Sequence, residues 1–224
     1  MSKPVAFSYS RLDSYETCPK KYWEISVSKR VKDAGNEFTE YGNLVHKAFA
    51  AYFLKNASLP MQISQHQKIL SPIKGAPGAK YVEQKLALNA NYEGTDWFAK
   101  DAYVRVISDL TIINGERGVL FDWKTGKQKD DFTQLRLAGA VVFLLDQDVQ
   151  TLDLVYYWTK TKTFTRDRER GPLTREQMPE VFNELAPRLQ RYQDAHAKQD
   201  FPARPNWTCK FCPVTSCPYW EKRK

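Results

Sequence analysis

Two aspartates and a lysine have the residue types and the spacing that best suit chemistry in this chain. Asp109 closes one apolar run, and Asp122 and Lys124 lie in the next, with the turn signal Asn114-Gly115 between the two runs. Residues two apart in a strand point to the same face about 7 Å apart, so Asp122 and Lys124 project together. Neighbouring carboxylates repel unless a cation lies between them, and carboxylate oxygens suit Mg²⁺ or Mn²⁺. The pattern favours metal-assisted hydrolysis of a phosphodiester, with Lys124 positioning or deprotonating the attacking water.

The same Asp-x-Lys spacing also suits a surface ion pair at the end of a strand, so further residues bear on the choice. His46 lies in a segment with helical periodicity, and Glu83 lies in an apolar, strand-like segment. Each has a plain structural alternative, as a hydrogen-bonded imidazole and as a solvent-facing strand residue. We expect His66 and His196, in polar surroundings, at the surface.

Four cysteines form a second pattern. Cys209, Cys212 and Cys217 lie close together, and Cys18 lies near the other end of the chain. Thiolates spaced this closely can converge on one metal centre, and four of them close it. A Cys₄ zinc site, an iron–sulfur cluster and four unrelated thiols stay open as interpretations. The spacing departs from the usual two C-x₂-C arms of zinc sites, whereas proline follows three of the cysteines, as in ferredoxin-like runs.

The elements that must position these residues are helices around a strand meander. Ser10 or Asp13 is the expected cap of a first helix that runs through Tyr15 and stops near Cys18. The box Thr174-x-x-Gln177 caps a last helix. Helical periodicity predicts helices over 39–54, 130–145 and 174–198; alternation and turn residues predict strands over 81–89, 102–108, 110–113, 119–123, 152–158 and 162–166, and a loop over 73–78. This order predicts an α/β or α+β fold with a central mixed sheet flanked by helices.

Composition limits the classes of protein. The chain has 224 residues, 42% of them hydrophobic, which excludes global disorder and favours one domain. Its 34 Lys+Arg against 26 Asp+Glu give a formal charge of +8, which favours a polyanionic partner. No apolar run approaches the roughly 20 residues of a membrane span, and the polar start Met1-Ser2-Lys3-Pro4 is no signal peptide. We therefore expect a cytoplasmic protein with reduced thiols and no membrane partner.

Basic residues gather in four places: Lys20-Lys21, Lys29–Lys32, Lys160–Arg170 and Glu221–Lys224. Aromatic residues such as Trp23 and Phe164 lie among them and could stack on the bases of a single strand. The alternative is that Trp23 packs beside the cysteines and that the 160–170 segment is a solvated hairpin tip. The chain has no phosphate-loop motif of the Gly-x-x-x-x-Gly-Lys-[Ser/Thr] type, so any unwinding motor must be another chain.

Taken in order, these residues resemble the RecB-type branch of the PD-(D/E)XK nucleases over most of the chain. The residues that carry the resemblance are Gly42-x-x-x-His46, Glu83, Asp109, the run Asp122-Trp123-Lys124-Thr125-Gly126, and Gln134. The resemblance implies that His46, Asp109, Asp122 and the Trp123 carbonyl bind Mg²⁺ or Mn²⁺. It makes Lys124 the catalytic lysine, Glu83 a strand acid of the site, and Gln134 a residue that organises the site or contacts DNA. The family often has Tyr four residues after that Gln, where this chain has Ala138.

The cysteines and the motif Tyr9-Ser10-Arg11-Leu12 before Cys18-Pro19 resemble the iron–sulfur members of that branch, the AddB-type domains and the CRISPR-associated exonucleases. This resemblance implies a structural 4Fe-4S cluster on Cys18, Cys209, Cys212 and Cys217. The cluster would join 1–37 to 200–224 within a single nuclease domain, 1–224, whose core is about 38–160.

The resemblance also implies an activity, a single-stranded DNA exonuclease of 5′→3′ polarity that acts on DNA ends. The expected setting is CRISPR adaptation, phage recombination or DNA repair in a bacterial, archaeal or phage-encoded protein, with a protein partner in adaptation or recombination. The alternative is a non-catalytic DNA-binding or assembly subunit that keeps the fold and cluster. The presence of His46, Asp109, Asp122 and Lys124 argues against it. A structural zinc-binding protein is a further rival, and the sequence indicates no oligomeric state.

Overall fold

The computed structural model describes residues 4–33, 35 and 37–220. The start of the chain, Met1–Lys3, and the basic run Glu221–Lys224 lie outside the described residues. The chain divides into two compact units, one of residues 36–182 and the other of residues 1–35 together with 183–224. Both proposed sites can be described within single units, because the carboxylate and lysine residues all lie in the first and the four cysteines all lie in the second.

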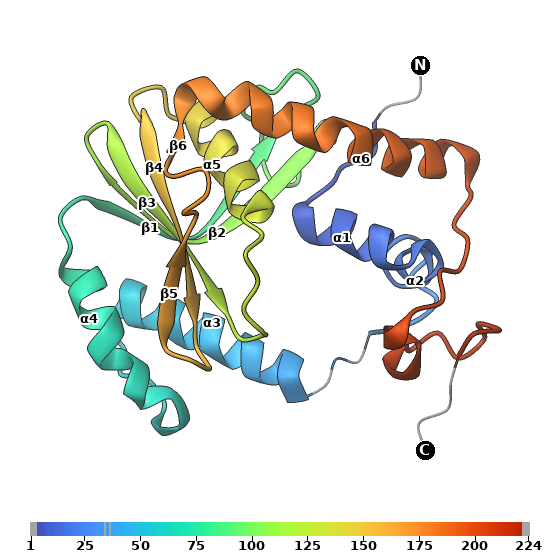
Figure 1. Cartoon of the computed structure of the whole chain (residues 1–224), viewed down its shortest axis with the longest axis horizontal. Coiled ribbons are helices and arrows are strands. Elements are labelled where there is room, and N and C mark those ends of the chain that lie inside the picture. Colours follow the sequence, from blue (N-terminus) through green and yellow to red (C-terminus); the bar gives the residue numbers. More distant parts are fainter. Residues whose placement is uncertain (1–3, 34, 36, 221–224) are drawn as a thin grey trace. The chain divides into compact units, whose positions relative to one another are not determined.

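A mixed sheet forms the centre of the 36–182 unit (Figure 1). Its strands follow the order β1-β2-β3-β4-β5, and β6 pairs with β4. The pairs are antiparallel except β3 with β4, which are parallel and are connected through helix α5. The bounds are β1 Ala79–Leu88, β2 Val104–Asn114, β3 Arg117–Lys124, β4 Thr151–Trp158, β5 Thr163–Arg166 and β6 Leu173–Thr174.

Helices cover both faces of this sheet, as Figure 1 shows for α3 and α5. On one face, helix α3 (Glu37–Lys55), the 3₁₀ segment Met61–His66 and helix α4 (Gln67–Gly75) enclose a core with the odd-numbered side chains of β3 and β4, Trp123 and Tyr157 among them. On the other face, α5 (Thr133–Leu145) lies so close that a Cβ on Gly139 would meet Leu173, Leu152 and Leu154. Successive side chains of a strand point to opposite faces, so the continuous apolar runs of β3 and β4 bury both faces of the sheet.

The second unit is helical and surrounds the cysteines. It contains α1 (Tyr9–Thr17), α2 (Pro19–Tyr22), the π-helical turn Trp23–Val27, most of α6 (Met178–Lys198) and the 3₁₀ turn Trp207–Phe211. The Oγ atom of Ser8 accepts a hydrogen bond from the Arg11 N–H, so the expectation of Ser10 or Asp13 as the cap was wrong. Buried Tyr22 and Tyr192 join α2 to α6 through hydroxyl groups 2.5 Å apart.

The mixed sheet flanked by helices confirms the predicted fold class, and Thr174 and Gln177 form the predicted capping box. Three further local expectations were wrong. The two strands predicted over 102–113 are one strand, β2, and the segment predicted as a loop from residue 73 begins within α4. His66 is fully buried, with Nδ1 2.6 Å from the Tyr157 hydroxyl, rather than at the surface. Among the described residues, no helix is both long and apolar enough to cross a membrane.

Candidate active site

The sheet divides at the two aspartates. Strand β2 pairs with β3 only from Asn114 to Leu110, which lies opposite Phe121. Beyond that point β3 continues beside β4 as far as Lys124, while β2 continues beside β1. Asp109 and Asp122 are the next residues on the two separating strands, and both are buried. The Oδ2 atom of Asp109 accepts a hydrogen bond of 2.7 Å from the Trp123 N–H, so this carboxylate replaces the interstrand bond that is missing there.

The second pair of strands is irregular at the same level. The pairing of β1 with β2 runs through Val82 and resumes at Gln84, but it omits Glu83 and Asp109. Glu83 has φ 49°, in the left-handed region that non-glycine residues seldom occupy. Such a conformation is strained, and strained residues cluster at functional sites. The kink directs the Glu83 carboxylate toward His46.

His46 reaches this place from α3. The helix buries its apolar side in the core beneath the sheet, and His46 lies beside that buried stripe. Its Nδ1 atom is 3.1 Å from Asp109 Oδ1 and 3.9 Å from Glu83 Oε1. A Cβ on Gly42, one turn earlier, would lie 3.3 Å from Thr125 Oγ1, so glycine lets α3 approach the turn that follows Lys124. This close approach gives a physical reason for the Gly-x-x-x-His spacing.

Asp122, Lys124 and Gln134 form a triangle on the β3 side of the point where β2 and β3 separate. The Lys124 ammonium lies 2.8 Å from Asp122 Oδ2 and donates to Gln134 Oε1, also over 2.8 Å. The Gln134 side-chain amide donates to Asp122 Oδ1 over 2.9 Å. The Lys124 ammonium also lies 5.1 Å from the centroid of the buried Tyr156 ring, within cation–π range. Gln134 therefore fixes both the carboxylate and the ammonium in one arrangement.

Burial and like charges raise the proton affinity of the site. Burial, then the charge of Asp109, raise the pKa of Asp122 to about 6, although Lys124 acts in the opposite direction. Burial, followed by Asp109, also raises the pKa of Glu83 above its usual value. Burial alone would lower the pKa of His46, but the hydrogen bond and charge of Asp109 outweigh it, with help from Asp122 and Glu83, so that this pKa is raised. A divalent cation would offset the cost of burying these carboxylates next to one another.

The donor set fits a divalent metal. One ligand atom from each of His46, Glu83 and Asp109 lies within 4.8 Å of the other two. Asp122 stands outside that group and faces Lys124 and Gln134, yet its buried Oδ2 atom has no hydrogen-bond partner among the described residues beyond its ion-pair contact. A carboxylate oxygen with the Lys124 ammonium as its one partner retains a lone pair for a metal bond. The structure therefore brings together all the side chains predicted from the sequence; that the Trp123 carbonyl is a ligand stays a prediction.

Two contributors to the site carry no clear signal in the sequence. Tyr156, under the Lys124 ammonium, comes from β4, and only the parallel pairing of β3 with β4 reveals its position. The buried ion pair between Arg136 Nε and Asp167 Oδ2, 2.8 Å long, connects the helix of Gln134 to the segment after β5. Ala138, at the position where related sequences often have Tyr, is buried within α5.

Comparison with known proteins defines the class. The chain matches the PD-(D/E)XK nuclease superfamily over residues 6–218 and belongs to that superfamily. Its members are hydrolytic nucleases that use divalent metals, and a His/Glu/Asp group able to bind one is present here. The chain is similar to the crystal structure of SSO0001, with 15% identity, coverage of 99% of this chain and 90% of that one, and a TM-score of 0.41. No curated protein matches the chain.

The four cysteines line one pocket in the second unit, together with residues such as Lys21 and Val214. The N–H of Arg204 points to the Cys18 sulfur over 3.5 Å, and that of Asn206 points to the Cys209 sulfur over 3.4 Å. Burial raises the pKa of the Cys212 thiol, and nearby Cys18 and Cys217 raise it further. No three of the described cysteine sulfurs lie within 4.8 Å of one another.

Proposed function

We propose that this chain is a RecB-like nuclease that hydrolyses single-stranded DNA from its ends, with a 4Fe-4S cluster as a structural centre. The observation that carries the nuclease assignment is the contact of one ammonium, Lys124, with Asp122 and Gln134 beside the His46–Glu83–Asp109 group. An ammonium held next to a metal-binding carboxylate suits the reaction because charge develops on the phosphate and on the attacking water at that point.

Each side chain has a distinct task in the proposed reaction. His46, Glu83 and Asp109 would hold a Mg²⁺ or Mn²⁺ ion with Asp122 and the Trp123 carbonyl. That ion would lower the pKa of a bound water and offset phosphate charge. Lys124 would orient the attacking water or receive its proton. Gln134 would keep Lys124 from rotating away from Asp122, since it bonds both.

The arrangement of the cysteines supports a 4Fe-4S cluster over zinc. Thiolates on one tetrahedral zinc with Zn–S bonds of about 2.3 Å lie about 3.8 Å apart, so any three would fall within 4.8 Å. The described cysteines form no such group of three. A 4Fe-4S cluster gives each thiolate its own iron, so its four sulfurs do not converge on one metal atom. The proposed cluster is structural, since it would join Cys18 to Cys209, Cys212 and Cys217 from the far end of the chain.

Metal analysis tests the cluster. Protein purified without oxygen should be brown, with absorbance near about 400 nm from cysteine-to-iron charge transfer and about four irons per chain. A Cys18→Ser variant should lose that absorbance. A colourless protein with one zinc per chain would overturn the assignment.

Strand polarity and pathway rest on the resemblance to RecB-like and CRISPR-associated nucleases. We propose 5′→3′ exonucleolytic action in CRISPR adaptation, phage recombination or DNA repair, with a protein partner there. The strongly basic composition, +8, supports a DNA substrate. Binding should weaken steeply as salt rises, because phosphate contacts release counterions.

Digestion of end-labelled DNA tests the function. Single- and double-stranded substrates, with free or blocked ends, are incubated with Mn²⁺ or Mg²⁺, and the labelled products report polarity. Asp122→Ala and Lys124→Ala should abolish cleavage, whereas Asp148→Ala and Lys68→Ala, at exposed positions, should cleave as the unaltered chain does. Equal cleavage by all variants would overturn the site, and DNA binding without any cleavage would favour the non-catalytic subunit.

A further inference from the structure

We propose that the outer half of the β1–β2 hairpin carries a stacking platform for one unpaired base of the substrate strand. The platform consists of the rings of Trp97 and Phe98 with the cations Lys85 and Arg105. It rests on the proposed nuclease function, since it names the form of nucleic acid that the same site accepts.

The platform lies on the side of the sheet from which His46 approaches. Side chains three apart in a regular strand face opposite ways, yet the Ser108 and Thr111 hydroxyls lie 2.6 Å apart. The alternation of β2 therefore changes phase at Asp109. Since Leu110 belongs to the core under α3, Ser108 faces away from α3 and Ile107 faces toward its side of the sheet.

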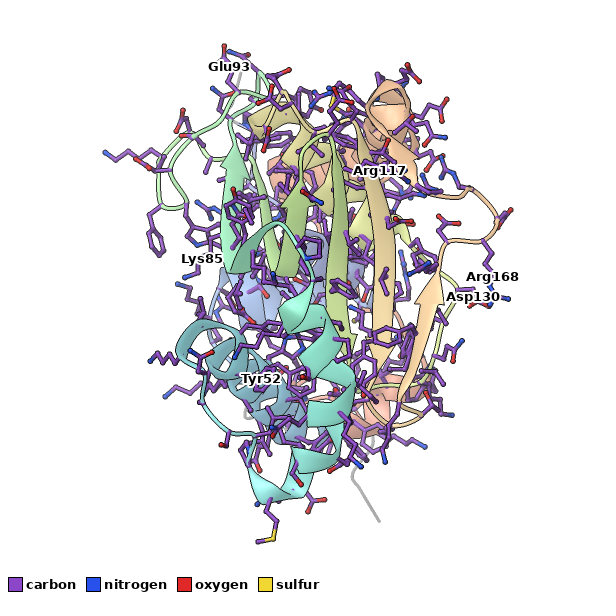
Figure 2. All side chains as sticks on the ribbon, turned by 90° about the vertical axis from the view of Figure 1, so that its left-hand side faces the viewer. Tyr52, Lys85, Glu93, Arg117, Asp130 and Arg168 are labelled. Atoms are coloured by element: carbon purple, nitrogen blue, oxygen red, sulfur yellow. The ribbon has the colours of Figure 1, made fainter. Side chains whose placement is uncertain are left out.

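The same alternation of side chains puts both cations on the α3 side of the sheet. Arg105 shares the face of Ile107, and Lys85 lies directly opposite Ile107 in the neighbouring strand. Lys85 follows Glu83 by two residues along β1. The edge of the platform thus begins beside the proposed metal ligands, and Figure 2 shows Lys85 on the edge strand β1.

Two cations lie beside the rings. Lys85 Nζ lies 5.8 Å from the centroid of the Trp97 ring and 6.0 Å from that of Phe98, and Arg105 Cζ lies 5.9 Å from that of Trp97. No ion pair between either cation and a carboxylate is found in the described part of the chain, although Lys85 lies within electrostatic reach of Glu83, and the buried Arg105 Nε has no hydrogen-bond partner there. Their charges remain available to phosphates.

The loop that presents the rings is ordered by its own hydrogen bonds. The Thr95 N–H donates to the Ala87 carbonyl over 3.1 Å, which returns the loop to the edge of β1. The carboxylates of Glu93 and Asp101 accept hydrogen bonds from Asn89 and Thr95. These two side chains therefore help to hold the loop in one conformation.

Phe98 is the ring that a base would meet, because 85% of its surface is exposed, whereas Trp97 is half-buried near both cations. An aromatic ring held in water on an ordered loop gains nothing for the fold. With cations beside it, it offers the arrangement by which proteins hold single strands: stacking for the base and positive charge for the backbone. A base inside a duplex has both faces covered, so the platform requires an unpaired nucleotide near the cleavage site.

Oligonucleotide binding tests the platform in the full chain, with EDTA present to prevent cleavage. Phe98→Ala should bind fluorescein-labelled (dT)₁₂ about 5- to 150-fold more weakly, the range for loss of one base stack. Its affinity for an abasic 12-mer should not change, and Phe98→Tyr, which keeps the ring, should restore (dT)₁₂ binding. Met61→Ala removes another side chain that is 89% exposed and should have no effect.

A second pair of variants tests the role of charge. Lys85→Gln should lower the salt dependence of binding. Arg117→Gln, at the end of β3 remote from Lys124, is the control and should leave the salt dependence unchanged. Equal (dT)₁₂ binding by Phe98→Ala and Met61→Ala, or equal losses for (dT)₁₂ and the abasic strand, would overturn the platform. Cleavage with Mn²⁺ is measured in parallel on the unaltered chain. Its absence would overturn the proposed nuclease function, while a base-dependent loss in Phe98→Ala would still support the platform.

Discussion

Glu83 and Asp109 face each other across β1 and β2 at the one position where the pairing of these strands is interrupted. The ladder is regular on both sides of them, and Glu83 takes a left-handed backbone conformation there. Carboxylates directly opposite each other destabilise a sheet. The fold accepts this arrangement and the backbone strain together, which is what a site built around a cation requires.

Replacing Glu83 by Gln should therefore separate folding from metal binding. Removing one of the two facing charges should raise the thermal midpoint of the protein in EDTA, because the repulsion with Asp109 is gone. The same change should reduce the increase in midpoint that Mn²⁺ produces, since a ligand charge is lost. Differential scanning calorimetry with and without Mn²⁺ measures both. Glu93→Gln, in the loop after β1, is the matched control, and a Glu83→Gln protein with an undiminished Mn²⁺ response would remove Glu83 from the metal site.

The pKa of Asp122, about 6 in the fold against an ordinary value of 3.8, predicts two opposite pH effects. Between these values the folded protein without metal holds more protons than the unfolded chain, so its stability should fall as pH rises from about 4 to 6. Metal binding should strengthen over the same rise, because the metal must displace that proton. Urea titrations in EDTA and Mn²⁺ titrations, both from pH 4.5 to 7.5, measure the two trends. In Asp122→Asn both trends should be weaker, and unchanged trends would assign the proton to another group.

Gln134 should affect turnover more than substrate binding. Gln134→Leu removes both hydrogen bonds of its side-chain amide, so that Lys124 and Asp122 lose their shared support. Loss of such a supporting residue typically costs about 10- to 100-fold in activity. Single-turnover cleavage should slow to that extent while the Kd for DNA stays the same. Gln147→Leu, at an exposed position after α5, controls for the loss of an amide; a weaker Kd with normal turnover in Gln134→Leu would make Gln134 a DNA contact instead.

The part of the site that the sequence could predict is the part set by local spacing. Asp122 and Lys124 share a face because they are two apart in one strand, and the periodicity around His46 is helical over its whole length. The polar pair Ser108-Asp109 interrupts an apolar run, and the sequence therefore predicted two strands where the structure has one, β2. The side-chain alternation of β2 changes phase at this pair.

Contacts between distant segments escaped prediction for a different reason. His66 has polar neighbours in the sequence, but its partner Tyr157 is 91 positions away and brings it into the core. The role proposed for Phe98 likewise depends on a tertiary contact, because β1 places Lys85 beside the loop that carries this ring. Side chains whose roles depend on tertiary pairing leave no periodic signal.

The ion pair of Arg136 with Asp167 should stabilise the segment beside the active site only while both partners are present. The two side chains are almost completely buried, with 2% and 7% of their surfaces exposed, and their charged atoms are 2.7 Å apart. Arg136→Met leaves a buried carboxylate without its cation and should lower the free energy of unfolding by about 3–5 kcal/mol. The double change Arg136→Met with Asp167→Leu should recover most of that loss, because an apolar pair of similar volume avoids the cost of desolvating charges. Urea unfolding of the unaltered chain, Arg136→Met, Asp167→Leu and the double variant forms a complete double-mutant cycle. Losses that simply add would show that the two charges do not depend on each other, and would leave the placement of Gln134 on α5 to packing alone.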